Sequence, residues 1–86
     1  MESYRIEFTR SAEKDLRKID RSRISAILRK IEQLQFNPRP DGSKKLAGAD
    51  RTYRVRVGDY RVVYEVEDDV LLVLVIRVAH RKDVYR

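Results

Sequence analysis

The chain has 86 residues, a formal net charge of +6 and no cysteine. This length suffices for one modest hydrophobic core, so we expect a single domain over residues 1–86. The lack of cysteine excludes disulfides and thiolate metal ligands, and with His80 as the single histidine we expect no metal and no cofactor. The excess of positive charge favours an anionic partner, either nucleic acid or an acidic protein, although a solvated basic surface is the alternative.

The sequence shows neither a signal peptide at its start nor an apolar run of membrane-spanning length. The first residues lack the apolar run of a signal peptide. The longest apolar run, residues 70–76, is too short to cross a bilayer. We therefore expect a cytoplasmic protein without a membrane partner.

The first half of the chain predicts one strand and two helices. Residues 4–8 alternate apolar with charged side chains, which is typical of a strand. Thr9 or Ser11 can cap a short amphipathic helix, and Asp20 can cap a longer one. The second helix carries an apolar stripe at helical spacing, formed by Ile24, Ile27, Leu28, Ile31 and Leu34. It must end by residue 37, because the next residue is Pro38.

Residues 38–50 predict a loop, and residues 51–66 predict a β-hairpin. In the loop, Lys44 and Lys45 are candidate phosphate contacts, with plain solvation as the alternative. In the hairpin, a two-residue turn at Gly58 and Asp59 would pair Val57 with Tyr60, Arg56 with Arg61, and Val55 with Val62. We assign Tyr53, Tyr60 and Tyr64 to packing.

This hairpin predicts a basic face shared by Arg54, Arg56 and Arg61. Like charges that face each other across a sheet are destabilising, so the pairing of Arg56 with Arg61 favours an anionic ligand between them. The alternative for these arginines and for Arg81 is ion pairing with nearby carboxylates, namely Glu65, Glu67 or Asp83.

Residues 70–76 predict a strand without alternation, which belongs in the middle of a sheet with both faces covered. The first strand, residues 4–8, then pairs with its free edge. The result is an α+β fold of order β-α-α-β-β-β, in which a small, antiparallel-rich, four-stranded sheet has the helical hairpin on one face. The arginine side of the sheet stays open.

The last residues, 77–86, form a tail with several candidate chemical groups, which include Arg77, His80, Arg81, Lys82 and Tyr85. Arginines with a nearby tyrosine and histidine suit phosphodiester chemistry, because guanidinium groups stabilise phosphoryl charge and aromatic rings stack on bases. RNA could be cut in this way without metal, through attack of the 2'-hydroxyl on the adjacent phosphate. His80 could transfer a proton, although a structural or solvated role is the alternative.

Three stretches resemble the RelE/ParE superfamily of toxin–antitoxin systems, and the resemblance covers nearly the whole chain. These stretches are Lys45 to Gly48, Tyr53 to Tyr64 and His80 to Tyr85, with Gly-Asp-Tyr-Arg-Val-Val-Tyr at residues 58–64 the most specific. The resemblance to the RelE-like branch implies a toxin that acts as a metal-independent, ribosome-dependent mRNA endonuclease, or mRNA interferase, and so inhibits translation and arrests growth. It also implies neutralisation by a cognate acidic antitoxin in a heteromeric complex.

The same resemblance implies roles for individual residues. Arg61 and Arg81 fall on arginines that stabilise the scissile phosphate, and Tyr85 falls on a C-terminal catalytic or base-stacking tyrosine. Arg54 and Arg56 fall where lysines are usual, one of them a proposed general base, and arginine is a poor proton acceptor. We therefore predict Arg61, Arg81, Tyr85 and His80 as catalytic residues. The predicted RNA-binding residues are Arg54, Arg56, Lys44, Lys45 and Lys82.

Two alternatives to the endonuclease stay open. ParE-like members share the fold but poison gyrase, and a degenerate toxin would bind an antitoxin without catalysis. For Tyr85, a purely structural role in pinning the tail to the core is the alternative.

Overall fold

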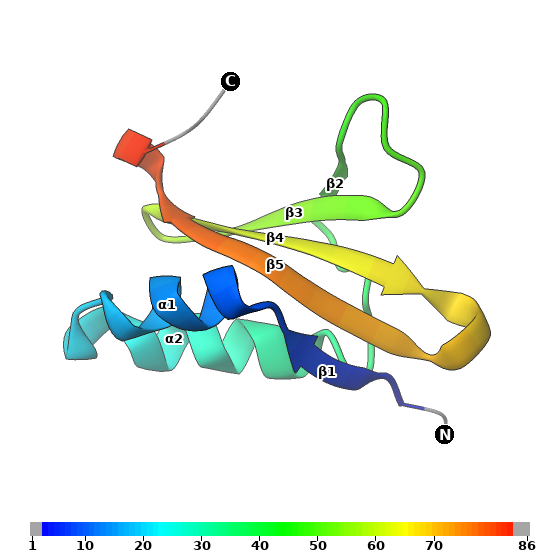
Figure 1. Cartoon of the computed structure of the whole chain (residues 1–86), viewed down its shortest axis with the longest axis horizontal. Coiled ribbons are helices and arrows are strands. Elements are labelled where there is room, and N and C mark those ends of the chain that lie inside the picture. Colours follow the sequence, from blue (N-terminus) through cyan, green and yellow to red (C-terminus); the bar gives the residue numbers. More distant parts are fainter. Residues whose placement is uncertain (1–2, 84–86) are drawn as a thin grey trace.

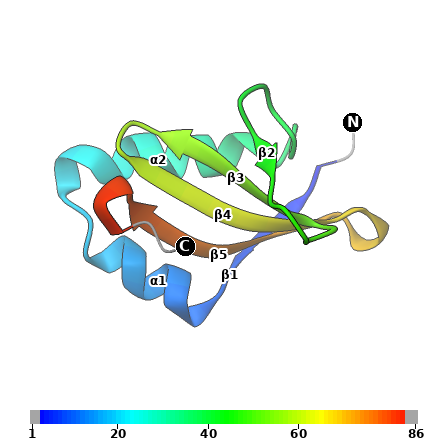
Figure 2. The same ribbon diagram turned by 90° about the horizontal axis from the view of Figure 1, so that it is seen from above.

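The computed structural model describes residues 3–83, in which two helices cover one side of a five-stranded sheet (Figures 1 and 2). The helices are α1 (Arg10–Arg17) and α2 (Arg21–Gln33). The strands are β1 (Arg5–Phe8), β2 (Lys44–Lys45), β3 (Thr52–Val57), β4 (Tyr60–Glu67) and β5 (Leu72–His80). Two 3-10 turns, Asp68–Val70 and Arg81–Asp83, follow β4 and β5.

The strands lie in the order β1-β5-β4-β3-β2, with β1 parallel to β5 and the other neighbours antiparallel. The α+β class, the helices on one face and the pairing of the first strand with the last are confirmed. The count of four strands was wrong, because Lys44 and Lys45 pair with β3 as a fifth strand. Two residues are too few for a visible alternation, so the sequence carries no signal for this strand.

The helices begin as their caps predict. Thr9 is the N-cap of α1, and its hydroxyl accepts a hydrogen bond from Ala12 N–H at 3.1 Å. Asp20 occupies the N-cap position of α2 but makes no side-chain capping bond. After α2, Pro38 is buried and its carbonyl accepts the hydroxyl of Tyr64 at 2.7 Å. This bond ties the loop after α2 to the middle of the sheet.

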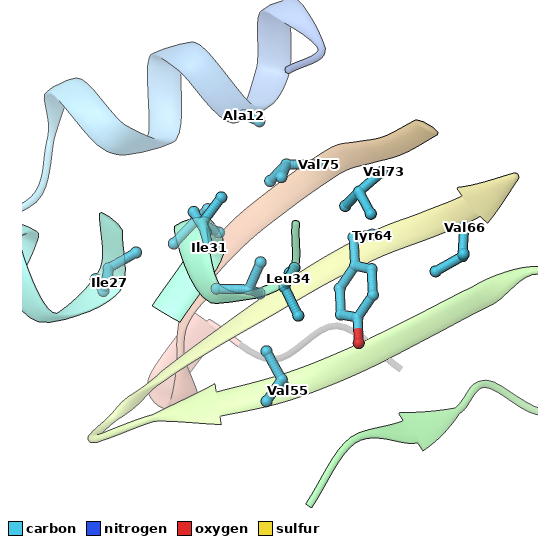
Figure 3. Close-up of a cluster of buried hydrophobic side chains, with 11 residues drawn as sticks. Ala12, Ile27, Ile31, Leu34, Val55, Tyr64, Val66, Val73 and Val75 are labelled. Atoms are coloured by element: carbon cyan, nitrogen blue, oxygen red, sulfur yellow. The ribbon is translucent and has the colours of Figure 1, made fainter. Parts of the chain in front are cut away.

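The core lies between the helices and the sheet, as Figure 3 shows. Ile27, Ile31 and Leu34 of the α2 segment meet β-sheet residues that include Tyr64 and Val75, all at most 2% exposed. Tyr64 is the largest fully buried side chain, and its ring stacks against Tyr53 at 6.0 Å between centroids. The packing roles predicted for Tyr53, Tyr60 and Tyr64 are confirmed, because all three contact this core.

Strand β5 runs to His80, four residues beyond the predicted end at Ile76. The register with β4 passes from Val63 opposite Arg77 to Tyr64 opposite Val75, which leaves Ile76 unpaired in a bulge. A bulge shifts the alternation of side chains by one residue. As a result Val73, Val75 and Val78 all face the core, whereas Arg77 is turned out of it. The predicted boundary was wrong because Arg77 breaks the apolar run without ending the strand.

A clasp formed by Arg39, Asp68 and Tyr4 closes the end of the molecule at which α2 ends. Arg39 donates two hydrogen bonds to the Asp68 carboxylate, at 2.8 and 3.3 Å, and Tyr4 donates a third at 2.6 Å. The hydrogen bonds from Arg39 and Tyr4 hold the pKa of Asp68 below its usual range. The clasp thus joins β1, the loop after α2 and the turn after β4.

Candidate nucleic-acid interface

The side of the sheet opposite the helices carries an arginine face, which we define as Lys44, Arg54, Arg56 and Arg61. Each of the three arginines alternates with a core residue of its strand, so it points away from the helices. Arg56 lies directly opposite Arg61, and Lys44 lies directly opposite Arg54. The predicted hairpin register is confirmed, and Gly58 has the positive φ, +59°, that its turn requires.

The arginine face forms no ion pair with any side chain that the structure describes. Among residues 3–83, none of its four side chains makes an ion pair or a side-chain hydrogen bond. Of the carboxylates that could have paired with them, Glu67 instead lies 3.6 Å from Arg51. For Arg54, Arg56 and Arg61, the alternative of ion pairing with Glu65 or Glu67 is therefore wrong, whereas the side chain of Asp83 lies outside the described part of the structure.

Arg61 is the least satisfied polar group of this face. Its side chain is partly buried, and its Nε is shielded from solvent without a hydrogen-bond partner. A buried donor without a partner costs about 1–3 kcal/mol. A guanidinium has five N–H donors in a planar fork that matches the oxygens of a phosphate. An anion seated between Arg56 and Arg61 would relieve their mutual repulsion.

Arg81 begins the 3-10 turn that follows β5, next to the turn of the β3–β4 hairpin. Its N–H donates to the carbonyl of Asp59 at 2.7 Å, and its guanidinium lies 3.8 Å from the Asp59 carboxylate. Arg23 of α2 lies 3.9 Å from the same carboxylate. The carboxylate neighbour of Arg81 is thus Asp59, which was predicted only as a turn residue. The available signal was an acidic residue at the turn between two strands that carry three arginines.

His80 lies on the other side of the sheet from the arginine face. It pairs with Tyr60, which packs against the core, and the two rings meet edge to face at 5.1 Å. Both line a pocket of about 270 Å³ together with Asp15, Lys18 and Ile19 of the α1 region. His80 Nδ1 accepts a hydrogen bond from Lys82 N–H at 3.1 Å. The structure therefore does not bring His80 together with Arg56 and Arg61.

The other predicted site residues are divided between several locations. Lys45 pairs with Tyr53, so alternation puts it on the opposite side of β2 from Lys44. Lys82 is exposed in the last 3-10 turn. Tyr85 lies outside the described residues. Val63 was not among the predicted site residues; it is a buried apolar residue that lies directly opposite Arg54 in the strand register.

Two further properties bear on the kind of site that is present. Among residues 3–83, no group of three or more His, Asp or Glu side chains is placed to hold a metal ion. In the same range, no helix has the length and apolar character that a membrane span needs.

The structure thus defines a small α+β protein whose sheet carries an arginine face without an ion-pair partner among the described side chains. Residues 6–85 match the family described as "ParE toxin of type II toxin-antitoxin system, parDE". The chain is 33% identical to toxin RelG of Mycobacterium tuberculosis, over 96% of this chain and 97% of that protein. It is 34% identical to toxin RelE3 of Methanocaldococcus jannaschii, over 91% of each. The chain therefore belongs to the RelE/ParE superfamily, as a RelE-like toxin of a type II toxin–antitoxin system.

Solved structures support the same assignment. The toxin–antitoxin complex RelBE2 of Mycobacterium tuberculosis contains a chain with a TM-score of 0.81 and 30% identity, over 92% of this chain and 99% of that one. The intact RelBE toxin–antitoxin complex of Escherichia coli gives a TM-score of 0.81 and 28% identity, over 96% of this chain and 99% of that one. The RelE-like fold expected from the sequence is confirmed.

Proposed function

We propose that this toxin is a ribosome-dependent mRNA endonuclease that acts in the cytoplasm and inhibits translation. The observation that carries the proposal is the pair formed by Arg56 and Arg61, which lie directly opposite each other in the strand register, have no ion-pair partner among the described side chains, and leave the Arg61 Nε unpaired. Such a pair is built for an anion of two or more oxygens, and the phosphodiester of RNA is one. Membership of the RelE-like toxins supports the same substrate.

In the proposed reaction, the 2'-oxygen of one nucleotide attacks its own 3'-phosphate. A bond forms between that oxygen and phosphorus, the bond to the 5'-oxygen of the next nucleotide breaks, and a 2',3'-cyclic phosphate results. The attacking hydroxyl loses a proton and the departing 5'-oxygen gains one. Negative charge builds up on the phosphoryl oxygens in the transition state, which is where fixed guanidinium donors accelerate a reaction most.

The proposed roles follow the chemistry of each side chain. Arg61 and Arg81 stabilise the phosphoryl oxygens, and Arg54, Arg56 and Lys44 hold the neighbouring phosphates. Lys45 and Lys82 add contacts to more distant phosphates. Tyr85 stacks on a base or transfers a proton. His80, the other residue predicted for proton transfer, lies on the opposite side of the sheet from Arg56 and Arg61. Arginine itself does not accept a proton near neutral pH, since its pKa exceeds about 12.

We also propose a cognate acidic antitoxin as the protein partner. The solved relatives named above are toxin–antitoxin complexes. An antitoxin whose carboxylates occupy the arginine face would neutralise it in the same way as RNA phosphates, so the two ligands would exclude each other.

The test is to map RNA ends after expression from a tightly repressed promoter. Primer extension on a translated message should show new ends within codons, and the same message without its start codon should remain intact. The Arg61→Ala variant, expressed at the same level, is the matched control and should give no new ends. Growth arrest without any new RNA ends would overturn the endonuclease.

The second candidate function is inhibition of gyrase, which the match to the ParE family favours. It predicts arrest of DNA replication and intact messages in the same expression experiment. A protein that leaves the cells growing and still binds its antitoxin would be a non-catalytic toxin instead.

A further inference from the structure

His80 makes a hydrogen bond to the turn that carries Arg81. Its Nδ1 lies 3.1 Å from the backbone nitrogen of Lys82, which donates the hydrogen bond. An Asx-turn has the same form, in which a side-chain acceptor binds the backbone N–H two residues ahead. The bond therefore closes the first residues of the 3-10 turn Arg81–Asp83 onto the end of β5.

The ring of His80 makes a second contact, with the ring of Tyr60. The two residues lie directly opposite each other on β4 and β5, and their rings meet edge to face at an angle of 85°. Both line the pocket beside α1, where Asp15, Lys18 and Arg77 are the charged neighbours. His80 is thus fixed at both ends, by packing on its ring and by a hydrogen bond at Nδ1.

The same turn fixes Arg81 against the hairpin. Arg81 N–H donates to the Asp59 carbonyl at 2.7 Å, and Asp59 lies two residues before Arg61 along the chain. Two hydrogen bonds therefore hold the backbone at Arg81. The Arg81 N–H donates to the Asp59 carbonyl, and the next N–H, that of Lys82, donates to His80 Nδ1. Loss of the second hydrogen bond would free the turn to move relative to Arg61.

We infer that His80 is a positioning residue that holds Arg81 next to the arginine face, and that it does not transfer the protons of the reaction. Its Nδ1 is already occupied as an acceptor, and its pairing and ring contact with Tyr60 place it on the side of the sheet opposite Arg56 and Arg61. The inference deepens the proposed function and rests on it for its effect on cleavage. Its structural part, the hold on the turn, does not depend on that function.

Two variants separate the two contacts of His80. Asparagine carries an acceptor at the position of Nδ1 and can close the same Asx-turn, but it has no ring. Phenylalanine keeps a ring against Tyr60 but has no acceptor. We expect His80→Asn to cut RNA at close to the wild-type rate and His80→Phe to be about 5- to 10-fold slower, which is the equivalent of one hydrogen bond of about 1 kcal/mol.

A double-mutant cycle with Arg81→Ala gives the decisive comparison in single-turnover cleavage on programmed ribosomes. If His80 acts through Arg81, His80→Phe slows the wild-type enzyme and has no further effect in the Arg81→Ala background. A proton-transfer group would instead contribute about 100- to 10,000-fold, would not tolerate asparagine, and would lower the rate in both backgrounds. That second pattern would overturn the inference.

Amide hydrogen exchange tests the hold on the turn without any RNA. The Lys82 amide should exchange several-fold faster in His80→Phe than in the wild type and in His80→Asn, while the core amides of Val62 and Val73 stay equally protected and so report an intact fold. Unchanged Lys82 exchange in His80→Phe would contradict the inference. If the wild-type protein cuts no RNA, the proposed function is wrong, and the exchange result alone decides whether His80 positions the turn.

Discussion

Arg61 combines two unfavourable features that a folded protein normally avoids. It lies directly opposite another arginine, and its Nε is shielded from solvent without a partner. Both features disfavour the free protein, and a bound anion would relieve the repulsion between the two arginines. At the scale of single residues, Arg61 is therefore the position at which the site is most directly tested.

The first prediction concerns the fork geometry of Arg61. We expect Arg61→Ala to lower single-turnover cleavage by about 100- to 1000-fold, the usual effect of losing one donor to a developing negative charge. The cleavage rate of Arg61→Lys should fall between those of the wild type and Arg61→Ala, because an ammonium keeps the charge but cannot form two parallel hydrogen bonds. Arg5→Ala removes the same charge from the exposed β1 strand and should cut normally. Wild-type rates in Arg61→Ala would show that the arginine face serves docking.

The second prediction concerns the buried hydroxyl of Tyr64. This hydroxyl donates to the Pro38 carbonyl at 2.7 Å, and burial raises the pKa of Tyr64 to about 12. Removal of the donor in Tyr64→Phe leaves the carbonyl unpaired, so we expect the free energy of unfolding in urea to fall by about 1–3 kcal/mol. Tyr53→Phe is the control. The Tyr53 hydroxyl accepts a hydrogen bond from the exposed Arg39, so its removal should lower the free energy of unfolding less. Equal stability of Tyr64→Phe and wild type would contradict the buried bond.

At the scale of secondary-structure elements, α1 is joined to the end of β5 through Asp15. Strand β1 pairs only with residues 72–75 of β5, so the edge of β5 beyond them needs another partner. The Asp15 carboxylate accepts the N–H of Val78 at 2.9 Å and pairs with Arg77 at 2.9 Å. One side chain of a helix thus replaces a missing strand, which positions β5 and the residues that follow it.

The third prediction is a pH dependence of stability that comes from Asp15. Burial by itself raises the pKa of this carboxyl, but the hydrogen bonds from Arg77 and Val78 outweigh it and hold the pKa below the usual value. A carboxyl with a lowered pKa in the folded state stabilises the fold above its unfolded pKa of about 3.9, and this contribution is lost as the pH falls through the lowered value. We expect Asp15→Asn to reduce the loss of stability below about pH 4.

This dependence is measured as the urea midpoint at a series of pH values. Asp41→Asn removes the same charge from an exposed loop position and serves as the matched control. A pH profile of Asp15→Asn that coincides with the wild-type profile at every pH would show that the contact with β5 contributes no proton-linked stability.

At the scale of the whole molecule, the charge is unevenly arranged. The net charge is +6, and each ion pair that the structure describes uses a cation outside the arginine face, namely Arg5, Arg23, Arg39, Arg51, Arg77 or Arg81. The positive arginine face would attract an acidic partner over a distance set by the salt concentration.

The fourth prediction is that the complex with the cognate antitoxin weakens as salt rises. Between about 0.1 and 1 M salt the screening length falls from about 10 Å to about 3 Å, which removes most long-range attraction. Association rates measured by surface plasmon resonance should fall more than dissociation rates rise. The Arg54→Ala/Arg56→Ala variant should show a shallower dependence on salt, and Arg5→Ala should not. Equal affinity across this range would mean that apolar contact drives assembly.

Local patterns in the sequence determined the elements and the hairpin. A two-residue turn at Gly58 and Asp59 leaves a single register, so the pairing of Arg56 with Arg61 follows from the sequence alone. The caps and apolar stripes located both helices, and the unbroken apolar run located the central strand. In each of these cases the signal lies within a few neighbouring residues.

Features that depend on contacts between distant segments were decided only by the tertiary structure. The bulge at Ile76 turns Arg77 out and Val78 in, and no alternation pattern in β5 announces it. Asp59 meets Arg81 across 22 residues of chain, and His80 falls on the helix side because it pairs with Tyr60. The sequence thus predicts which residues are candidates for chemistry. Which of these residues share a face of the sheet depends on the strand register and on the bulge at Ile76. The packing of the whole sheet selects both the register and the bulge.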